Sequence, residues 1–234
     1  MPRRLLLISN STSHGSGYLD HCAAQVADFL GPVSRVLFVP WALHDRAGYA
    51  AKARQRLGQV GFAVDSLHEA ADVPAAVAAA EAVFIGGGNS FRLLRELHAT
   101  GAVDALRRRV AEGIPYMGAS AGTNVACPTI RTTNDMPIVE PPSFDALGLV
   151  PFQINPHYLD ADPASTHQGE TREQRLREFL EENDVPVVAL RESSMLRVEG
   201  GRVELLGSTA ARLFRRGEAP REHPPGSRLD GLLG

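Results

Sequence analysis

The stretch Ile114-Pro-Tyr-Met-Gly118-Ala119-Ser120-Ala121-Gly122-Thr-Asn124 decides the fold of this chain. A short apolar run stops at Gly118, a serine follows between two small residues, and a stretch compatible with a helix comes next. This Gly-x-Ser-x-Gly pattern is typical of a nucleophile elbow, a sharp turn between a strand and a helix that lifts the serine hydroxyl out of a sheet. The first N–H groups of that helix can then face a developing oxyanion. Because turns of small residues are common, the interpretation depends on partners for Ser120 elsewhere in the chain.

Strands and helices alternate on both sides of this stretch. Short apolar runs predict strands at 4–9, 34–39, 62–66, 82–85, 149–154 and 187–190. Apolar spacing and capping residues predict helices at 18–30, 47–59, 73–80, 90–98, 102–112 and 171–183, with Ser90 as the cap of its helix. Two alternating runs around Gly200-Gly201 predict a hairpin at 196–206, and residues 127–142 are expected to form a loop. This order predicts an α/β fold: a mostly parallel sheet with helices on both faces and a site at the carboxyl ends of its strands.

Composition narrows the possible functions. The chain has 234 residues and a formal net charge of −3, which gives no electrostatic reason to expect a nucleic-acid partner. Lys52 is the only lysine and follows Ala51, so the Gly-Lys-Ser/Thr signature of a phosphate-binding loop is excluded. The two cysteines, Cys22 and Cys127, do not make a disulfide framework.

The apolar runs are short and the C-terminal stretch is polar. No run approaches a secretion signal or a membrane span, so we expect a cytoplasmic protein that does not contact membranes. No composition shift marks a linker, which predicts one α/β domain over residues 1–216. Residues 217–234 are rich in Pro, Gly and charge, and are expected to form a loosely held tail.

Ser120 needs a base, because a serine hydroxyl is not ionised at neutral pH. His157 is the best candidate, since it follows a predicted strand at the same sheet edge and Pro156 stiffens its backbone. An imidazole in this role needs a carboxylate to fix its tautomer. Glu192, which follows the strand at 187–190, and Asp135 are both candidates, and their spacing in the sequence does not choose between them.

The glycine turn at 86–88, followed by Asn89, has two remaining interpretations. A dinucleotide-binding fingerprint is excluded because Phe91 stands where its last glycine should be. The turn is either purely structural or an oxyanion hole in which the backbone N–H groups of Gly88 and Ala121 face the substrate. The histidines and acids, Asp160, Asp162 and His167 included, match no metal motif, so we expect catalysis without a metal or cofactor.

Six short motifs occur in a fixed order along the chain. They are Gly-Gly-Gly-Asn-Ser-Phe at 86–91, Gly-Ala-Ser-Ala-Gly at 118–122, Thr-Asn-Asp-Met-Pro at 133–137, Asn-Pro-His at 155–157, His-Gln-Gly-Glu-Thr-Arg-Glu at 167–173, and Glu192. Together they resemble peptidase E, the aspartyl dipeptidase family of serine peptidases, over nearly the whole chain. The resemblance implies a sheet related to class I glutamine amidotransferases, with serine in place of cysteine at the elbow. It also implies metal-independent hydrolysis of dipeptides with an N-terminal aspartate (Asp-X).

The resemblance assigns roles to individual residues. It implies a triad of Ser120, His157 and Glu192, and it makes Asp135 a substrate-binding residue or an auxiliary acid. One departure from the family is Ser193, which stands where a glycine is expected after the glutamate and bears on the local turn.

A site for a dipeptide with an N-terminal aspartate needs a cation for the carboxylate and an acceptor for the ammonium group. Arg172, with its planar fork of donors, suits the carboxylate of an N-terminal aspartate. Asp135 or Glu170 could face the ammonium group, and Asn89 is expected near the substrate.

Two alternative functions stay open: another hydrolase on this scaffold, such as an esterase or a cyanophycinase-like peptidase, and a non-catalytic protein that binds small molecules. The protein is expected to be a monomer or a homodimer.

Overall fold

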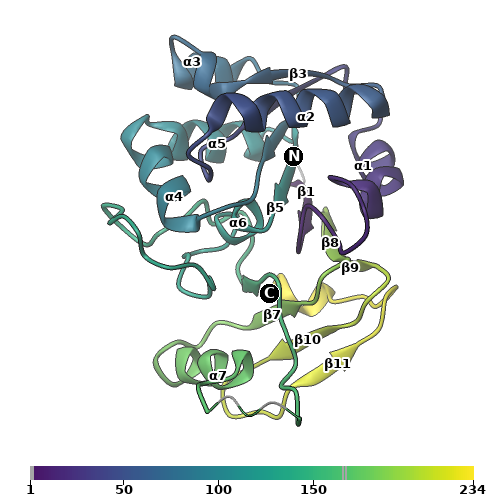
Figure 1. Cartoon of the computed structure of the whole chain (residues 1–234), viewed down its shortest axis with the longest axis vertical. Helices are drawn as coiled ribbons and strands as arrows, with labels where there is room; N and C mark the ends of the chain where they lie inside the picture. Colours follow the sequence, from purple (N-terminus) through teal and green to yellow (C-terminus); the bar gives the residue numbers. More distant parts are fainter. Residues whose placement is uncertain (1–2, 165, 167) are drawn as a thin grey trace.

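The computed structural model describes residues 3–164, 166 and 168–234. Its main sheet has the strand order β3-β2-β4-β5-β1-β8-β9 (Figure 1). These strands are β1 (Arg4–Ile8), β2 (Arg35–Val39), β3 (Ala63–Ser66), β4 (Val83–Ile85), β5 (Pro115–Ala119), β8 (Ser194–Glu199) and β9 (Arg202–Gly207). The pairs from β3 to β1 are parallel, whereas β8 and β9 form the predicted hairpin and run antiparallel.

Helices cover both faces of this sheet. They are α1 (Ala23–Leu30), α2 (Arg46–Val60), α3 (Val73–Ala78), α4 (Ser90–Ala99), α5 (Ala102–Ala111) and α6 (Ala121–Asn124). Helix α7 (Arg172–Glu182) instead packs against strands of a second sheet. Short 3-10 turns occur at Asp20–Cys22, Leu67–Glu69 and Asp230–Leu232. The cap of α4 is Asn89 and not Ser90, since the Asn89 side chain accepts a hydrogen bond from Arg92 N. A capping box between Thr171 and Gln174 starts α7.

Strand β1 shows why the sheet lies between two layers of helices. Its side chains alternate between the faces: Leu5 and Leu7 join the cluster that contains α4 and α5, whereas Leu6 and Ile8 pack with α1 and α2. All four are fully buried. A continuous apolar run is what a strand covered on both faces requires. The predicted α/β fold with a mostly parallel sheet is therefore confirmed.

A second, smaller sheet corrects one expectation. Its order is β11-β10-β7-β6, with β6 (Gln153–Asn155), β7 (Val187–Leu190), β10 (Ala211–Phe214) and β11 (Arg221–His223). The strands predicted at 149–154 and 187–190 therefore do not extend the main sheet, and β10 and β11 were not predicted at all. In Figure 1 this sheet lies below the main sheet, beside α7. Val188 and Leu190 of β7 pack into the main core, while Val187 and Ala189 pack toward α7.

The segment after Arg216 is packed, in contrast to the expected loose tail. Strand β11 pairs with β10, and Leu229 and Leu232 are buried in the main core. The carboxylate of Asp230 accepts a hydrogen bond from Val203 N at 2.8 Å. The expectation from the Pro- and Gly-rich composition was wrong because two buried leucines anchor this segment.

Across the part of the chain that the structure describes, no helix is both long and apolar enough to cross a bilayer.

Candidate active site

Ser120 lies at a sharp turn between β5 and α6. Its backbone has φ 54° and ψ −110°, a conformation that side-chain-bearing residues rarely adopt. The turn also needs Gly122, because a Cβ there would overlap the carbonyl oxygen of Ile85 on the adjacent strand β4. Helix α6 has only four residues, so individual backbone N–H groups, and not a long helix dipole, can favour an anion here. The strand, the sharp turn and the short helix occur in the order that the Gly-x-Ser-x-Gly pattern predicts.

Three side chains form a continuous hydrogen-bonded relay. Nε2 of His157 lies 2.9 Å from Oγ of Ser120, and Nδ1 of His157 lies 2.9 Å from Oε1 of Glu192. His157 follows β6 and Glu192 follows β7, and these two strands are parallel neighbours whose carboxyl ends meet. Of the two acids left open by the sequence, Glu192 therefore contacts the imidazole. The relay comes from both sheets, and the edge that it occupies is shared between them.

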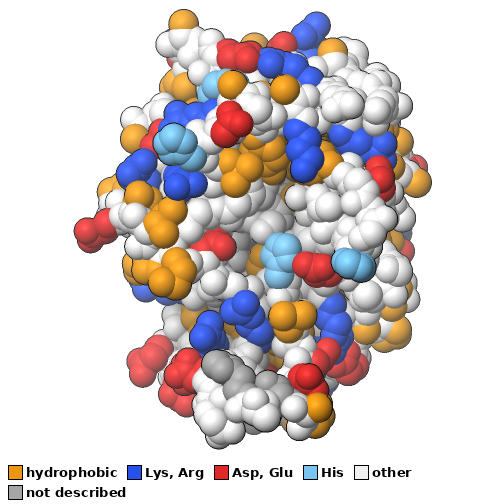
Figure 2. All heavy atoms as spheres, in the orientation of Figure 1, with side chains coloured by type: hydrophobic (Ala, Val, Ile, Leu, Met, Phe, Trp, Pro, Cys, Tyr) orange, Lys and Arg blue, Asp and Glu red, His pale blue; other side chains and the backbone are white. Residues whose placement is uncertain are grey.

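The relay is accessible to solvent. The side chains of His157 and Glu192 are 40% and 47% exposed. Figure 2 shows a hollow near the centre of this face of the molecule, with histidine and acidic side chains gathered at its rim. A substrate can therefore reach the Ser120 hydroxyl without a large rearrangement.

Strained backbone is concentrated around the relay. Four described residues other than glycine have positive φ: Leu19, Ser120, His157 and Ser193. Two of them are relay residues and Ser193 directly follows the third. Ser193 has φ 65°, which explains why a glycine is expected at this position. Such conformations cost roughly 1–3 kcal/mol each and persist only where surrounding contacts enforce them.

Buried polar residues at the end of β1 provide such contacts, and sequence reasoning missed them. Oγ of Ser9 accepts a hydrogen bond from His157 N at 3.0 Å and donates one to the carbonyl of Leu190 at 2.9 Å. Oδ1 of Asn10 accepts one from Ser193 N at 2.7 Å. Both side chains are fully buried. They fix the segments that carry His157 and Glu192 against the main sheet.

The glycine turn after β4 presents one backbone donor to the site. Gly88 has φ 134°, and a Cβ there would meet the carbonyl oxygen of Ala42 at 2.6 Å, so only glycine fits. The neighbouring N–H of Gly87 is already used, because it donates to the buried hydroxyl of Tyr49 at 2.8 Å. The N–H groups of Gly88 and Ala121 donate to no acceptor among residues 3–164, 166 and 168–234. They are therefore available to an oxyanion beside Ser120.

A cavity of about 240 Å³ opens on one side of the Ser120–His157 pair. Arg172 and Asp135 both line it, which gives it one cation and one anion. Asp135 accepts hydrogen bonds from Ser90 N at 2.7 Å and from the Thr133 hydroxyl at 3.0 Å. Partial burial lowers the pKa of Arg172, and Arg175 adds to this effect, whereas Asp135 raises it.

Two of the predicted substrate-binding residues do not line this cavity. The Asn89 side chain caps α4 and donates to the carbonyl of Met136 at 2.8 Å. Glu170 is half-exposed and pairs with Arg175 at 3.4 Å. Both residues have local structural partners instead. His167, the first residue of the 167–173 motif, lies outside the described residues.

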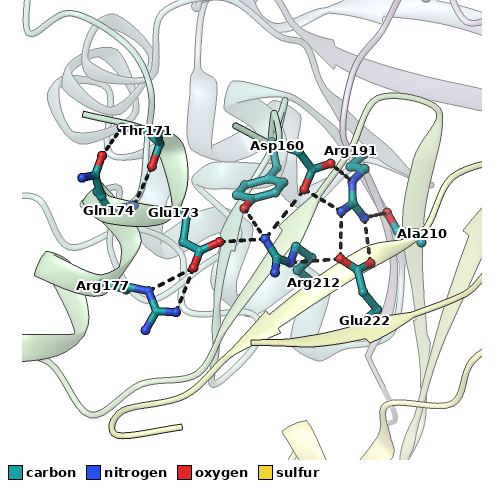
Figure 3. Close-up of polar contacts among 10 residues, drawn as sticks. Asp160, Thr171, Glu173, Gln174, Arg177, Arg191, Ala210, Arg212 and Glu222 are labelled. Atoms are coloured by element: carbon teal, nitrogen blue, oxygen red, sulfur yellow. Dashed lines mark hydrogen bonds and ion pairs between the residues drawn. The ribbon is translucent and has the colours of Figure 1, made fainter. Parts of the chain in front are cut away.

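An ion-pair network supports the two segments that carry the relay (Figure 3). Arg191, which precedes Glu192, binds Asp160 through Nε at 2.7 Å and Nη2 at 2.8 Å. It also binds Glu222 of β11 at 3.0 and 2.9 Å and the carbonyl of Ala210 at 3.0 Å. Asp160 lies three residues after His157. Arg191 thus joins the segment after β6 to the segment after β7. We name Arg191 and its three partners, Asp160, Glu222 and Ala210, the clamp.

Across residues 3–164, 166 and 168–234, no group of three or more His, Cys, Asp and Glu side chains is arranged to hold a metal ion. Both cysteines are buried, and burial raises the pKa of Cys22 and of Cys127 to about 12. At neutral pH neither is a reactive thiolate.

Comparisons with known proteins agree with this architecture. Peptidase E of Streptomyces coelicolor is 63% identical over 229 residues, which cover 98% of this chain and 94% of that protein. The probable alpha-aspartyl dipeptidase of Drosophila melanogaster is 48% identical over 234 residues, covering 99% and 98%. The crystal structure of a peptidase from an acI-B1 Actinobacterium matches the fold with a TM-score of 0.71 at 15% identity, covering 98% of this chain and 97% of its own. The profile of peptidase family S51 matches residues 5–206. The chain belongs to peptidase family S51.

Proposed function

We propose that this protein is a serine peptidase that hydrolyses dipeptides with an N-terminal aspartate. The observation that carries the proposal is the relay of Ser120, His157 and Glu192, with both hydrogen bonds at 2.9 Å, beside a cavity that holds one cation and one anion. The names of the two curated relatives support the same activity.

The relay performs acyl transfer in two steps. With Nδ1 protonated and bonded to Glu192, Nε2 of His157 accepts the proton of Ser120 as Oγ attacks the carbonyl carbon. The backbone N–H groups of Gly88 and Ala121 bind the oxyanion. The C–N bond breaks, His157 gives its proton to the leaving amine, and an ester to Oγ remains. Water attacks that ester, again with His157 as base, and releases the aspartate.

The cavity beside the relay suits the aspartyl residue. Its side-chain carboxylate can pair with the Arg172 guanidinium, and its ammonium group can pair with Asp135. Asp135 is held by a backbone N–H and a hydroxyl, so it can offer its other oxygen without moving. Asn89 and Glu170 have no part in this binding scheme because they lie outside the cavity. The protein is expected to act in the cytoplasm, as a monomer or a homodimer.

The test uses chromogenic Asp, Glu and Leu amides and the dipeptide Asp-Leu. The wild-type protein should prefer aspartate, and Ser120→Ala should abolish turnover while keeping the folded state. Arg172→Met should reduce kcat/KM for the aspartyl substrates by about 10- to 100-fold, the value of a hydrogen bond to a charged group. Arg175→Met, which removes a charge from the same helix, serves as the control. Unchanged hydrolysis by Ser120→Ala would refute the proposal.

A further inference from the structure

A second cavity, of about 450 Å³, adjoins the relay and has no role in the scheme above. Ser120 and His157 line it, as they line the smaller cavity that holds Arg172 and Asp135. The reactive hydroxyl therefore stands where the two cavities meet. A peptide whose carbonyl carbon reaches Ser120 must extend into both, with the aspartyl residue on one side and the leaving residue on the other.

The second cavity contains Lys52, the only lysine of the chain. Its ammonium group lies 4.7 Å from the ring centre of Tyr18, a cation–π contact that holds the side chain over the cavity. Asp45 also lines the cavity, where its carboxylate caps α2 by accepting from Gly48 N at 2.8 Å, and Asp20 pairs with Arg56 at 2.9 Å. Within the described part of the chain, Lys52 forms no ion pair with a carboxylate. An ammonium group in this position is free to bind an anion.

The chemistry of the substrate supplies that anion. In a dipeptide the leaving residue ends in a carboxylate, one residue beyond the bond that breaks. A longer peptide places a neutral amide at the same position. We infer that Lys52 binds the terminal carboxylate of the leaving residue, and that this contact selects dipeptides over longer peptides and amides. The inference rests on the proposed function, since it assigns the side of the relay that the leaving residue occupies.

The cavity wall also explains how this contact can bear on catalysis. The hydroxyl of Tyr49 accepts the Gly87 N–H at 2.8 Å, and its ring packs against Tyr18, with centroids 6.1 Å apart. Lys52 contacts Tyr18 in turn. A carboxylate bound at Lys52 thus places the leaving residue against Tyr18 and Tyr49, and Tyr49 also binds the glycine turn. In this position the carbonyl group of the bond to be cleaved lies next to Gly88.

The experiment compares Asp-Leu with Asp-Leu amide, which differ only in the terminal carboxylate. For the wild type, kcat/KM should be about tenfold higher for the acid, as expected for one partly exposed charged contact. Lys52→Met should reduce this ratio to near one by slowing only the acid, and Lys52→Arg should restore much of it. Arg54→Met provides the control: Arg54 lies on the same helix but pairs with Glu69 outside the cavity, so the ratio should not change.

Two outcomes would overturn the inference: an unchanged ratio in Lys52→Met, with or without an equal loss on both substrates, or the same change in Arg54→Met. An equal loss would mean that Lys52 only supports Tyr18. Binding separates this inference from the proposed function, since Ser120→Ala cannot turn substrate over. Calorimetry with Ser120→Ala should show tighter binding of Asp-Leu than of its amide, and the Ser120→Ala/Lys52→Met protein should lose the difference. Absence of hydrolysis by the wild type, with this binding difference intact, would refute the proposed function alone.

Discussion

Arg191 should contribute to stability and to catalysis through the clamp, and Arg191→Met tests both. The side chain of Arg191 is 20% exposed and makes two bidentate ion pairs, with Asp160 and with Glu222, plus a bond to the carbonyl of Ala210. Each acid is half-exposed, so each pair contributes roughly 0.5–1 kcal/mol. The carbonyl bond adds about 0.5–1.5 kcal/mol. Methionine keeps most of the apolar stem, so the expected loss in free energy of unfolding is about 1.5–3.5 kcal/mol.

Urea denaturation at pH 7 measures this loss. Arg35→Met is the matched control, because Arg35 makes one ion pair with Asp65 in which both side chains are more than half exposed. That variant should lose less than about 0.5 kcal/mol. Because the clamp joins the segments after His157 and Glu192, Arg191→Met should also lower kcat by about tenfold, with a smaller effect on KM.

The pH dependence checks the cause of this loss. The hydrogen bonds from Arg191 lower the pKa of Asp160 below its ordinary value. A lowered pKa in the folded state stabilises the protein above the unfolded value, and this stabilisation is lost as pH falls through the folded value. The deficit of Arg191→Met should therefore be complete above about pH 4 and shrink below it. A loss indistinguishable from that of Arg35→Met, or a deficit that grows in acid, would refute the reasoning.

Five further substitutions test the site and the fold. Glu192→Gln should lower kcat by about 10³-fold with little change in KM, because the imidazole loses the partner that fixes its tautomer. Asp135→Asn should chiefly raise KM for aspartyl substrates in steady-state assays, and the opposite pattern for these two variants would mean that their roles are exchanged. Ser9→Ala should cost about 1–3 kcal/mol in urea denaturation, because it leaves the partly buried His157 N–H without an acceptor, and an unchanged midpoint would contradict this. Gly122→Ala should cost about 1–3 kcal/mol because its Cβ overlaps Ile85, whereas Gly58→Ala, which has open space on α2, should stabilise by about 0.5–1 kcal/mol.

Much of the main sheet could be predicted from the sequence because its strands are buried on both faces. Runs such as Leu5 to Ile8 are apolar without interruption, and this pattern is typical of a central parallel strand. The second sheet could not be distinguished in the same way. Strand β7 is just as apolar, since Val188 packs into the main core and Val187 packs toward α7. An apolar run reports burial, but it does not report which sheet the strand joins.

The elbow was predictable for a different reason. The turn at Ser120 requires small neighbours, and Gly122 is visible in the sequence because nothing larger fits against β4. The identity of the acid was not predictable from spacing, because Glu192 follows a predicted strand, Asp135 lies in a predicted loop, and spacing does not show which of them reaches the imidazole. Only the pairing of β6 with β7 brings Glu192 to the imidazole. Asp135 is instead held at the start of α4, where its carboxylate accepts a hydrogen bond from Ser90 N.

The hydrogen bonds of Ser9 that hold the relay could not be predicted from the local sequence. The hydroxyl of Ser9 binds the backbone of residues 148 and 181 positions away, and no motif marks a serine at the end of a strand as such a bridge. Yet these contacts are necessary on physical grounds. Ser120, His157 and Ser193 all adopt positive φ, and an unsupported chain would relax each of them. At the relay the fold therefore imposes backbone conformations that these residues do not prefer locally. Such conflicts are expected where a functional site must be held in one geometry. It follows that substitutions at Ser9 or Arg191 should reduce activity and stability together, although neither side chain belongs to the relay.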